Sequence, residues 1–396
     1  MSKVCVVGLG YMGLPMAAIL ARAGHDVVGV DINPKVVERV NQGVCPFSEP
    51  GMPELIAEAH KSGRLKAVAV PEAAEIYVLS LPTPVDHTTH EADMSYVVAG
   101  ARSLAPVLQG GELVVLESTS PIGATRRDVK DVIEKLRPEL AGKVEYVFCP
   151  ERAIPGNTLK EMVENDRLVG GLTPEATARG KALYASFCKG ALLEASAEEA
   201  EMVKLVENAS RDVQLAFCNE LHMVCDRLGL DFFKVVDLAN HHPRVNIFKP
   251  NSAGVGGHCI AVDPWFIINA VAGYAPLMRA ARGVNDAKPG WVLEKVQAVA
   301  KPGAVVACLG LAYKPDVDDL RESPGVEVAR ELVKQGYDVR VVEPHLDEWE
   351  IPLVGLEAAV GAADVVVTLT GHSAFKGLDR SLLKGKAVVD AVGLWR

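Results

Sequence analysis

The segment that most constrains the fold is a Gly-x-Gly-x-x-Gly motif at residues 8–13. An apolar strand is expected at residues 3–7, just before the motif, and a helix at residues 14–23, just after it. Asp31 closes the next expected strand. In a βαβ unit the first glycine allows the tight turn, the second lets a pyrophosphate approach, and the third lets helix and strand pack closely. Because all these parts are in register, the sequence predicts a dinucleotide-binding Rossmann-like unit.

The same motif predicts which dinucleotide is bound. The helix N-terminus offers free N–H groups and a positive dipole end to a phosphate. Asp31 is expected to bind the adenosine ribose hydroxyls and to repel a 2′-phosphate, and no arginine follows it directly. That favours NAD, while Lys35 leaves NADP open. FAD is disfavoured because the chain lacks a large flavin-domain extension. The expected cofactor contacts within the motif are Gly8, Gly10, Tyr11, Met12 and Gly13.

Strands and helices alternate on both sides of one long helical segment. Apolar residues recur at three- and four-residue steps from about residue 202 to residue 228, which predicts a long amphipathic helix ended by Gly229. The alternation elsewhere implies parallel βαβ units. The expected fold class is therefore α/β, with two Rossmann-like lobes of parallel sheet joined by a central helical domain. The expected boundaries are 1–190 for the NAD-binding domain, 191–290 for the helical domain and 291–396 for the C-terminal lobe.

Composition excludes several classes of partner. A formal net charge of −10 and the absence of a basic stretch argue against nucleic acid. The sequence contains no run of roughly 18 apolar residues, so no membrane helix is expected. The N-terminus does not resemble a signal peptide. The eight cysteines are scattered, without Cys-x-x-Cys or zinc-site spacing. We therefore expect a cytoplasmic protein with reduced thiols and no metal site.

A second glycine-rich stretch, at residues 254–257, leads directly into His258 and Cys259. A thiol in this setting can be a nucleophile, and the dinucleotide motif can provide the oxidant, so one interpretation is covalent oxidation of an alcohol. The other is a glycine turn beside a small buried cysteine. A Cys/His protease is disfavoured, since neighbouring side chains diverge and the chain begins with a dinucleotide fold. The residues alone leave the first two interpretations open.

Other polar segments follow the expected strands or lie on the long helix. Thr83, Thr119 and Glu151-Arg152 each come after a strand, whereas Lys204 and Asn208 lie one turn apart on the helix. Together with Lys314 and Arg321 of the expected C-terminal lobe, this set resembles the UDP-glucose/GDP-mannose 6-dehydrogenase family over the whole chain. The segments at residues 149–156, 165–167, 242–246 and 389–395 resemble the branch that oxidises UDP-N-acetyl-D-mannosamine.

The resemblance implies a four-electron oxidation that uses two NAD molecules. A primary alcohol at the sixth carbon of the sugar becomes an aldehyde and then a carboxylate. An aldehyde has no hydride to give until a nucleophile adds to it, and Cys259 would add to form a thiohemiacetal. Loss of a second hydride would leave a thioester, which water hydrolyses.

The resemblance also implies roles for the other residues. Lys204 and Asn208 would stabilise the oxyanion, Asp263 would act as a base or orient water, and Glu151 would activate or position the hydrolytic water. Arg244 would reach the sugar nucleotide, in its own site or in that of the neighbouring subunit. The remaining expected cofactor contacts are Asp31, Thr83, Thr119 and Arg321. The remaining expected substrate contacts are Glu151, Arg152, Lys204, Asn208, Gly256, Gly257 and Lys314, the two glycines letting the backbone approach the sugar nucleotide.

The resulting hypothesis is a UDP-N-acetyl-D-mannosamine 6-dehydrogenase that provides a surface polysaccharide precursor. Alternatives with the same chemistry are UDP-N-acetylglucosamine, UDP-glucose and GDP-mannose as substrate. A one-step 2-hydroxyacid or 3-hydroxyacyl dehydrogenase would need neither Cys259 nor the C-terminal lobe, and a non-catalytic nucleotide-binding protein is a third possibility. The expected partners are a UDP-sugar and a second copy of the chain, with no nucleic acid and no membrane.

Overall fold

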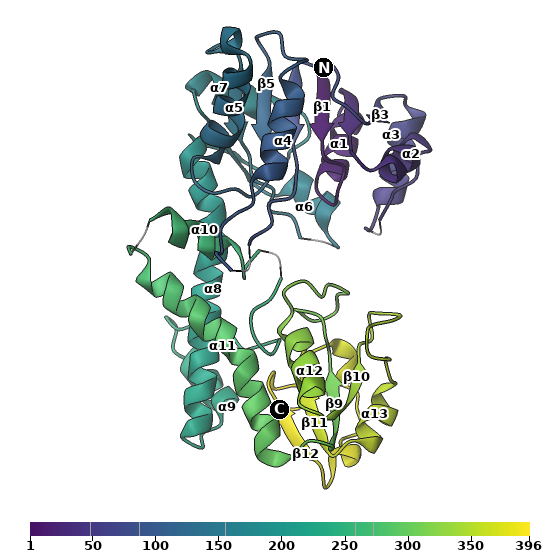
Figure 1. Cartoon of the computed structure of the whole chain (residues 1–396), viewed down its shortest axis with the longest axis vertical. Coiled ribbons are helices and arrows are strands. Elements are labelled where there is room, and N and C mark those ends of the chain that lie inside the picture. Colours follow the sequence, from purple (N-terminus) through teal and green to yellow (C-terminus); the bar gives the residue numbers. More distant parts are fainter. Residues whose placement is uncertain (48, 87, 155, 258, 272) are drawn as a thin grey trace. The chain divides into compact units, whose positions relative to one another are not determined.

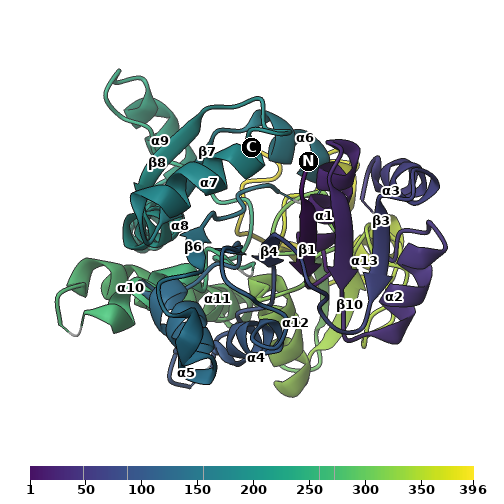
Figure 2. The same ribbon diagram turned by 90° about the horizontal axis from the view of Figure 1, so that it is seen from above.

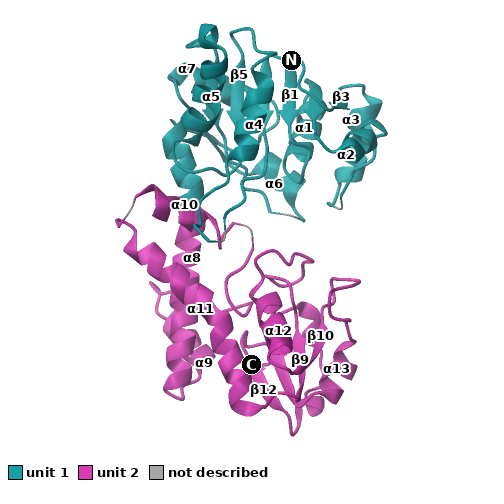
Figure 3. Cartoon of the chain, in the orientation of Figure 1, with its two compact units in different colours: residues 1–206 teal, residues 207–396 magenta. Residues whose placement is uncertain are grey.

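The structure is a computed structural model that describes residues 1–47, 49–86, 88–154, 156–257, 259–271 and 273–396. His258, which follows the second glycine stretch, lies outside the described residues. The chain forms two compact units, Met1–Val206 and Glu207–Arg396 (Figure 3). The boundary falls within the long helix α8 (Ala197–Arg227). This helix confirms the one expected from the apolar periodicity. Among the described residues, no helix has the length and hydrophobicity needed to cross a membrane.

The first unit is built on an eight-stranded sheet of order β3-β2-β1-β4-β5-β6-β7-β8 (Figure 1). Every pair of neighbouring strands is parallel except β6 and β7, which run antiparallel. The expected α/β class is confirmed, with this one antiparallel pair as a departure from a purely parallel sheet. The strands are β1 (Lys3–Val7), β2 (Asp26–Val30), β3 (Leu65–Val68), β4 (Ile76–Leu79), β5 (Leu113–Leu116), β6 (Glu145–Phe148), β7 (Arg167–Gly171) and β8 (Leu192–Ser196).

Helices cover both faces of this sheet, which explains why its central strands are apolar throughout. Successive side chains of a strand point to opposite faces. In β1, Val4 and Val6 pack in one core cluster with α1 and α3, while Cys5 and Val7 pack in another with α4 and α5. Figure 2 shows α1 and α4 on opposite sides of the sheet. The helices are α1 (Gly13–Arg22), α2 (Pro34–Asn41), α3 (Met52–Lys61), α4 (Ser95–Leu104), α5 (Asp131–Leu136), α6 (Thr158–Glu164) and α7 (Pro174–Tyr184).

The second unit combines the end of α8 with further helices and a four-stranded parallel sheet of order β10-β9-β11-β12. Val292 and Val296 of α11 pack in the core on one face of this sheet, and α13 packs on the other face. The elements are α9 (Phe232–Asn240), α10 (Asp263–Ala270), α11 (Pro276–Val299), β9 (Val305–Leu309), α12 (Pro324–Lys334), β10 (Asp338–Val342), α13 (Leu356–Ala362), β11 (Val365–Thr368) and β12 (Ala387–Asp390).

Candidate active site

The glycine loop of the first unit has the geometry that a pyrophosphate needs. Gly8 has a φ of +95°, and a Cβ added there would lie 2.2 Å from the Ser80 carbonyl oxygen. A Cβ at Gly13 would lie 1.9 Å from the Gly8 carbonyl oxygen, so this position packs helix α1 against the turn. A Cβ at Gly10 would meet no atom within 4 Å. Helix α1 begins directly after this loop without a side-chain cap, so its positive dipole end is open to a phosphate.

Asp31 is held next to this loop. One carboxylate oxygen accepts a hydrogen bond from the Leu9 N–H at 3.0 Å and the other accepts one from the Asn33 N–H at 2.8 Å. Its side chain is only partly buried, which leaves acceptor positions for ribose hydroxyls. Loop, free helix end and acidic side chain together fit NAD.

Thr83 follows β4, which lies next to β1 in the sheet order, and Thr119 follows β5, which lies next to β4. The hydroxyl of Ser118 accepts a hydrogen bond from the Leu81 N–H at 2.8 Å and so ties their two loops together. Since the carboxyl ends of parallel neighbours meet at one edge, both threonines lie at the edge that carries the glycine loop. Arg321, the other expected cofactor contact, belongs to the second unit, where it forms an ion pair with Asp319 at 2.6 Å.

Glu151 follows β6 at the same edge of the sheet. Its Oε1 accepts hydrogen bonds from the Arg152 and Ala153 N–H groups at 2.7 and 2.8 Å, and its Oε2 accepts one from Arg167 at 2.7 Å. The side chain of Arg152 donates to the Asp166 carbonyl oxygen. Glu151 is thus an anchored carboxylate.

The long helix α8 places Lys204 and Asn208 one turn apart. Lys204 is 8% exposed. In the preceding turn the carboxylate of Glu201, fully buried, accepts hydrogen bonds from Gly123 and Thr125 and fixes this end of the helix within the first unit. Asn208 donates its amide N–H to Asp263 at 2.5 Å within the second unit.

Cys259 is partly buried and lies just before helix α10, which Asp263 begins. The Cys259 carbonyl oxygen accepts hydrogen bonds from the Val262 and Asp263 N–H groups at 3.1 and 2.8 Å. Asp263 is 2% exposed, and the Asn208 amide is one of its partners. The turn between thiol and helix therefore ties Cys259 to a buried carboxylate and its amide partner.

The glycines before Cys259 have a packing role that the sequence did not reveal. A Cβ at Gly256 would lie 2.3 Å from the Glu322 carbonyl oxygen. Gly257 has a φ of +84°, donates its N–H to the Arg321 carbonyl oxygen at 3.0 Å, and would place a Cβ 2.8 Å from the Tyr313 ring. Burial raises the pKa of Tyr313, and the charges of Asp319 and Cys259 raise it further. Both glycines thus hold the Cys259 segment against the loop at residues 313–322.

That loop belongs to a second copy of the dinucleotide-type turn, in the expected second Rossmann-like lobe. Gly310 has a φ of +91° and donates to the Val342 carbonyl oxygen, as Gly8 donates to that of Val30. The N–H of Leu311 donates to Glu343 at 2.6 Å, as that of Leu9 donates to Asp31. The repeat differs at Glu343, which is 4% exposed and also accepts from Ala312, His345 and His372. The carboxylate of Glu343 therefore forms its hydrogen bonds with groups of the protein itself.

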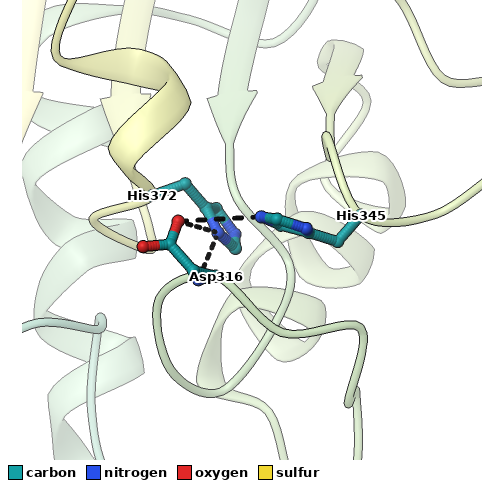
Figure 4. Close-up of side chains that lie close together, drawn as sticks. All are labelled: Asp316, His345 and His372. Atoms are coloured by element: carbon teal, nitrogen blue, oxygen red, sulfur yellow. Dashed lines mark hydrogen bonds and ion pairs between the residues drawn. The ribbon is translucent and has the colours of Figure 1, made fainter. Parts of the chain in front are cut away.

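His372, His345 and Asp316 form the one candidate metal cluster among the described residues (Figure 4). The Asp316 N–H donates to His372 Nδ1 at 2.9 Å, so Nε2 carries the proton and donates to Glu343 at 3.1 Å. Both oxygens of Asp316 accept from Ser373, at 2.8 and 2.7 Å. Hydrogen bonds from His372, Leu311 and Ala312 hold the pKa of Glu343 low despite burial. These groups already have partners, so the cluster braces the loop that carries Lys314.

Two further expected substrate contacts lie in the second unit. Lys314 is half-buried, with its Nζ 5.6 Å from the Tyr313 ring centroid. Arg244 is exposed, and its backbone N–H donates to His242 at 3.3 Å.

Sequence models of one family cover three successive parts of the chain. The NAD-binding domain of the UDP-glucose/GDP-mannose dehydrogenase family matches residues 2–188, its central domain matches 198–287, and its UDP-binding domain matches 307–396. The chain belongs to this family. It is a nucleotide-sugar dehydrogenase with NAD as its cofactor.

Individual relatives of this dehydrogenase cover its whole length. A protein of Ralstonia nicotianae named NDP-N-acetyl-D-galactosaminuronic acid dehydrogenase is 45% identical, with 99% of this chain and 96% of the relative covered. The UDP-N-acetyl-D-mannosamine dehydrogenase of Yersinia pestis is 43% identical, with 99% of each covered. The solved structure of UDP-N-acetyl-mannosamine dehydrogenase Cap5O from Staphylococcus aureus has a TM-score of 0.89 and 36% identity, with 99% of each chain covered.

Three buried residues of the first unit received no role from the sequence: Glu117, Arg167 and Tyr184. Tyr184 donates to Glu117 at 2.7 Å, and Arg167 bonds to Glu151. Burial raises the pKa of Glu117 to about 7. The positive charge of Arg167 lowers this pKa, and the negative charge of Glu151 raises it. In the sequence, the one sign of a role for Glu117 is its position directly after an apolar strand.

Proposed function

We propose that this dehydrogenase converts UDP-N-acetyl-D-mannosamine to UDP-N-acetyl-D-mannosaminuronate by oxidation at the sixth carbon. One observation carries the proposal: the chain combines an open glycine loop next to Asp31 with a partly buried Cys259 that is tied to a buried Asp263. The first feature suits a hydride acceptor and the second suits a covalent aldehyde intermediate. Relatives named UDP-N-acetyl-D-mannosamine dehydrogenase support this choice of sugar.

Each step of the reaction has a residue that can perform it. When bound, NAD accepts a hydride, and two molecules are consumed per sugar. In the first oxidation the alcohol loses a hydride from carbon and a proton from oxygen, for which Asp263 is the proposed base. The Cys259 thiolate then adds to the aldehyde, and the resulting oxyanion is stabilised by the charge of Lys204 and the amide of Asn208.

Loss of the second hydride leaves a thioester on Cys259. Water, positioned by Glu151, attacks the thioester carbonyl while its proton passes to that carboxylate. The carbon–sulfur bond breaks, and Cys259 leaves as a thiolate ready for another cycle. Atoms and electrons balance with two hydrides transferred and one water added.

The remaining assignments follow the same proposal. The NAD contacts are Gly8, Gly10, Tyr11, Met12, Gly13, Asp31, Thr83, Thr119 and Arg321. The substrate contacts are Glu151, Arg152, Lys204, Asn208, Arg244, Gly256, Gly257 and Lys314. Functionally, residues 1–190 bind NAD, residues 191–290 provide Cys259 and the dimer contact, and residues 291–396 bind the UDP portion.

We also propose a cytoplasmic homodimer that provides a precursor for surface polysaccharide. Phe217 and Val224 of α8 are 54% and 45% exposed, and Leu228, directly after its last residue, is 67% exposed; the three recur at helical spacing. An apolar stripe on a helix favours burial against another surface, and a second copy of the chain is the proposed partner.

A galacto-configured sugar is the second candidate, because a 45% identical relative is named for N-acetyl-D-galactosaminuronic acid. An initial-rate panel separates the candidates: UDP-N-acetylmannosamine, UDP-N-acetylgalactosamine, UDP-N-acetylglucosamine, UDP-glucose and GDP-mannose, each with NAD and with NADP. The proposal expects the highest kcat/KM for UDP-N-acetylmannosamine with NAD. A higher value for another sugar would replace it as the proposed substrate, and a preference for NADP would contradict the role given to Asp31.

A further inference from the structure

A buried ion pair holds Glu151 from an unexpected direction. β7 runs antiparallel to β6, so Arg167, the first residue of β7, lies at the end of β6 that Glu151 follows. The guanidinium donates to Glu151 Oε2 at 2.7 Å, and the two side chains are 4% and 9% exposed. A charge-assisted hydrogen bond in such a buried setting is strong and sensitive to geometry.

The orientation of Arg167 is itself fixed by other groups. Its Nε and a terminal nitrogen donate to the Met162 carbonyl oxygen at 3.4 and 3.3 Å. The guanidinium lies over the rings of Tyr184 and Phe187, at 4.9 and 5.4 Å from their centroids. A planar guanidinium held by stacking and by a carbonyl is a preorganised donor. It can therefore orient the carboxylate rather than follow it.

Three titratable groups besides Glu151 face Arg167. Because each of them favours its protonated form, Glu151 is the group that balances the positive charge of Arg167. Burial raises the pKa of Glu117 to about 7, so this carboxyl is largely protonated below neutral pH. Burial raises the pKa of Cys149 to about 12, and its sulfur lies 3.9 Å from the guanidinium. Burial also raises the pKa of Tyr184. Glu151 is then the one anion matched to the buried cation in this cluster.

We infer that Arg167 is a positioning residue that holds the Glu151 carboxylate in one orientation for the hydrolysis of the thioester on Cys259. A carboxylate has about four lone-pair sites. Arg152, Ala153 and Arg167 occupy three of them. One site remains to accept a hydrogen bond from the attacking water and then its proton. The inference rests on the proposed function, because it presumes that Glu151 positions this water.

Arg167→Met, Arg167→Lys and Glu151→Gln variants test the inference, alone and combined. A misplaced catalytic group reduces the rate by up to about 10²-fold. We therefore expect Arg167→Met to lower kcat by about 10- to 100-fold with little change in KM, and Arg167→Lys to lower it less. Intact-protein mass spectrometry during turnover should show sugar-nucleotide acyl-enzyme accumulating on Cys259 in the Arg167 and Glu151 variants.

The double variant gives the sharpest comparison. If Arg167 acts through Glu151, the double variant should have the same kcat as Glu151→Gln alone. Independent multiplication of the two losses, or slowing without acyl-enzyme, would overturn the inference. If Arg167→Met does not fold, Arg167→Lys in both backgrounds gives the same comparison.

A buried pair elsewhere provides the matched control. Arg282 is 2% exposed and donates to the buried Asp212 at 2.6 Å in the second unit. Arg282→Lys should lower the unfolding temperature without acyl-enzyme accumulation, and accumulation there would mean that stability loss alone produces the signal. If Glu151→Gln hydrolyses the thioester at the normal rate, the proposed role of Glu151 fails. If Glu151→Gln stalls and the Arg167 variants do not, only the inference fails.

Discussion

Two glycines of the same motif should respond in opposite ways to the same added methyl group. In Gly13→Ala the Cβ would lie 1.9 Å from the Gly8 carbonyl oxygen and 3.1 Å from the Ser80 Cβ. Optimal separation is about 3.5–4.0 Å, so backbone must shift. Overpacking of this kind costs about 1–3 kcal/mol. For a unit of this size that corresponds to a fall of roughly 2–4 °C in Tm per kcal/mol.

In Gly10→Ala the Cβ would meet no atom within 4 Å, and the φ of Gly10 is outside the left-handed range. The substitution should leave Tm unchanged or raise it slightly, because alanine restricts the unfolded chain. It should still weaken NAD binding, since the methyl group occupies the side from which a pyrophosphate approaches. A steric cost of about 1–3 kcal/mol corresponds to a roughly 5- to 150-fold rise in Kd.

Thermal unfolding and isothermal titration calorimetry with NAD measure both quantities on the same preparations. We expect Gly13→Ala to lose stability and Gly10→Ala to lose affinity alone. Wild-type affinity in Gly10→Ala would refute the placement of the pyrophosphate at this loop. Unchanged stability in Gly13→Ala would refute the packing argument.

Further variants test the thiol, the buried acid and the helix surface. Cys259→Ala should abolish uronate formation while leaving the Kd for NAD unchanged by calorimetry, and uronate formation in this variant would remove the covalent step. The fold raises the pKa of Glu117 from 4.5 to about 7, so the stability this group contributes is fully present below pH 4.5 and is lost as pH rises to about 7. Glu117→Gln should therefore raise Tm at pH 8 by removing a penalty of at most about 3 kcal/mol, with little change at pH 4.5; equal shifts at both pH values would contradict this. Phe217→Glu, at a 54% exposed position, should turn the proposed dimer into a monomer in light scattering, and an intact dimer would move the interface elsewhere.

Much of the fold could be read from local patterns. The register of the glycine motif with its strand, helix and Asp31 predicted the first unit, and apolar periodicity predicted α8. The strand β7 was not expected, although it contains Arg167. The last two residues of this strand are glycines, which are depleted in strands and so weaken the sequence pattern. The antiparallel direction depends on pairing with β6, a tertiary contact that the local sequence does not show.

The candidate site was predictable in its residue types but less so in its contacts. The spacing of Lys204 and Asn208 placed them one turn apart, whereas the bond from Asn208 to Asp263 joins residues 55 apart in sequence. Gly256 and Gly257 suggested an approach to substrate, and the structure shows close packing against the segment at residues 313–322. The acidity of Glu117 depends on burial, which sequence position alone does not provide.

The most direct test of the covalent four-electron oxidation is the number of NADH molecules formed per sugar nucleotide consumed, measured at completion with limiting UDP-N-acetylmannosamine. The account predicts two NADH per sugar, with uronate as the product. One NADH per sugar, with an aldehyde or ketone as the product, would contradict it.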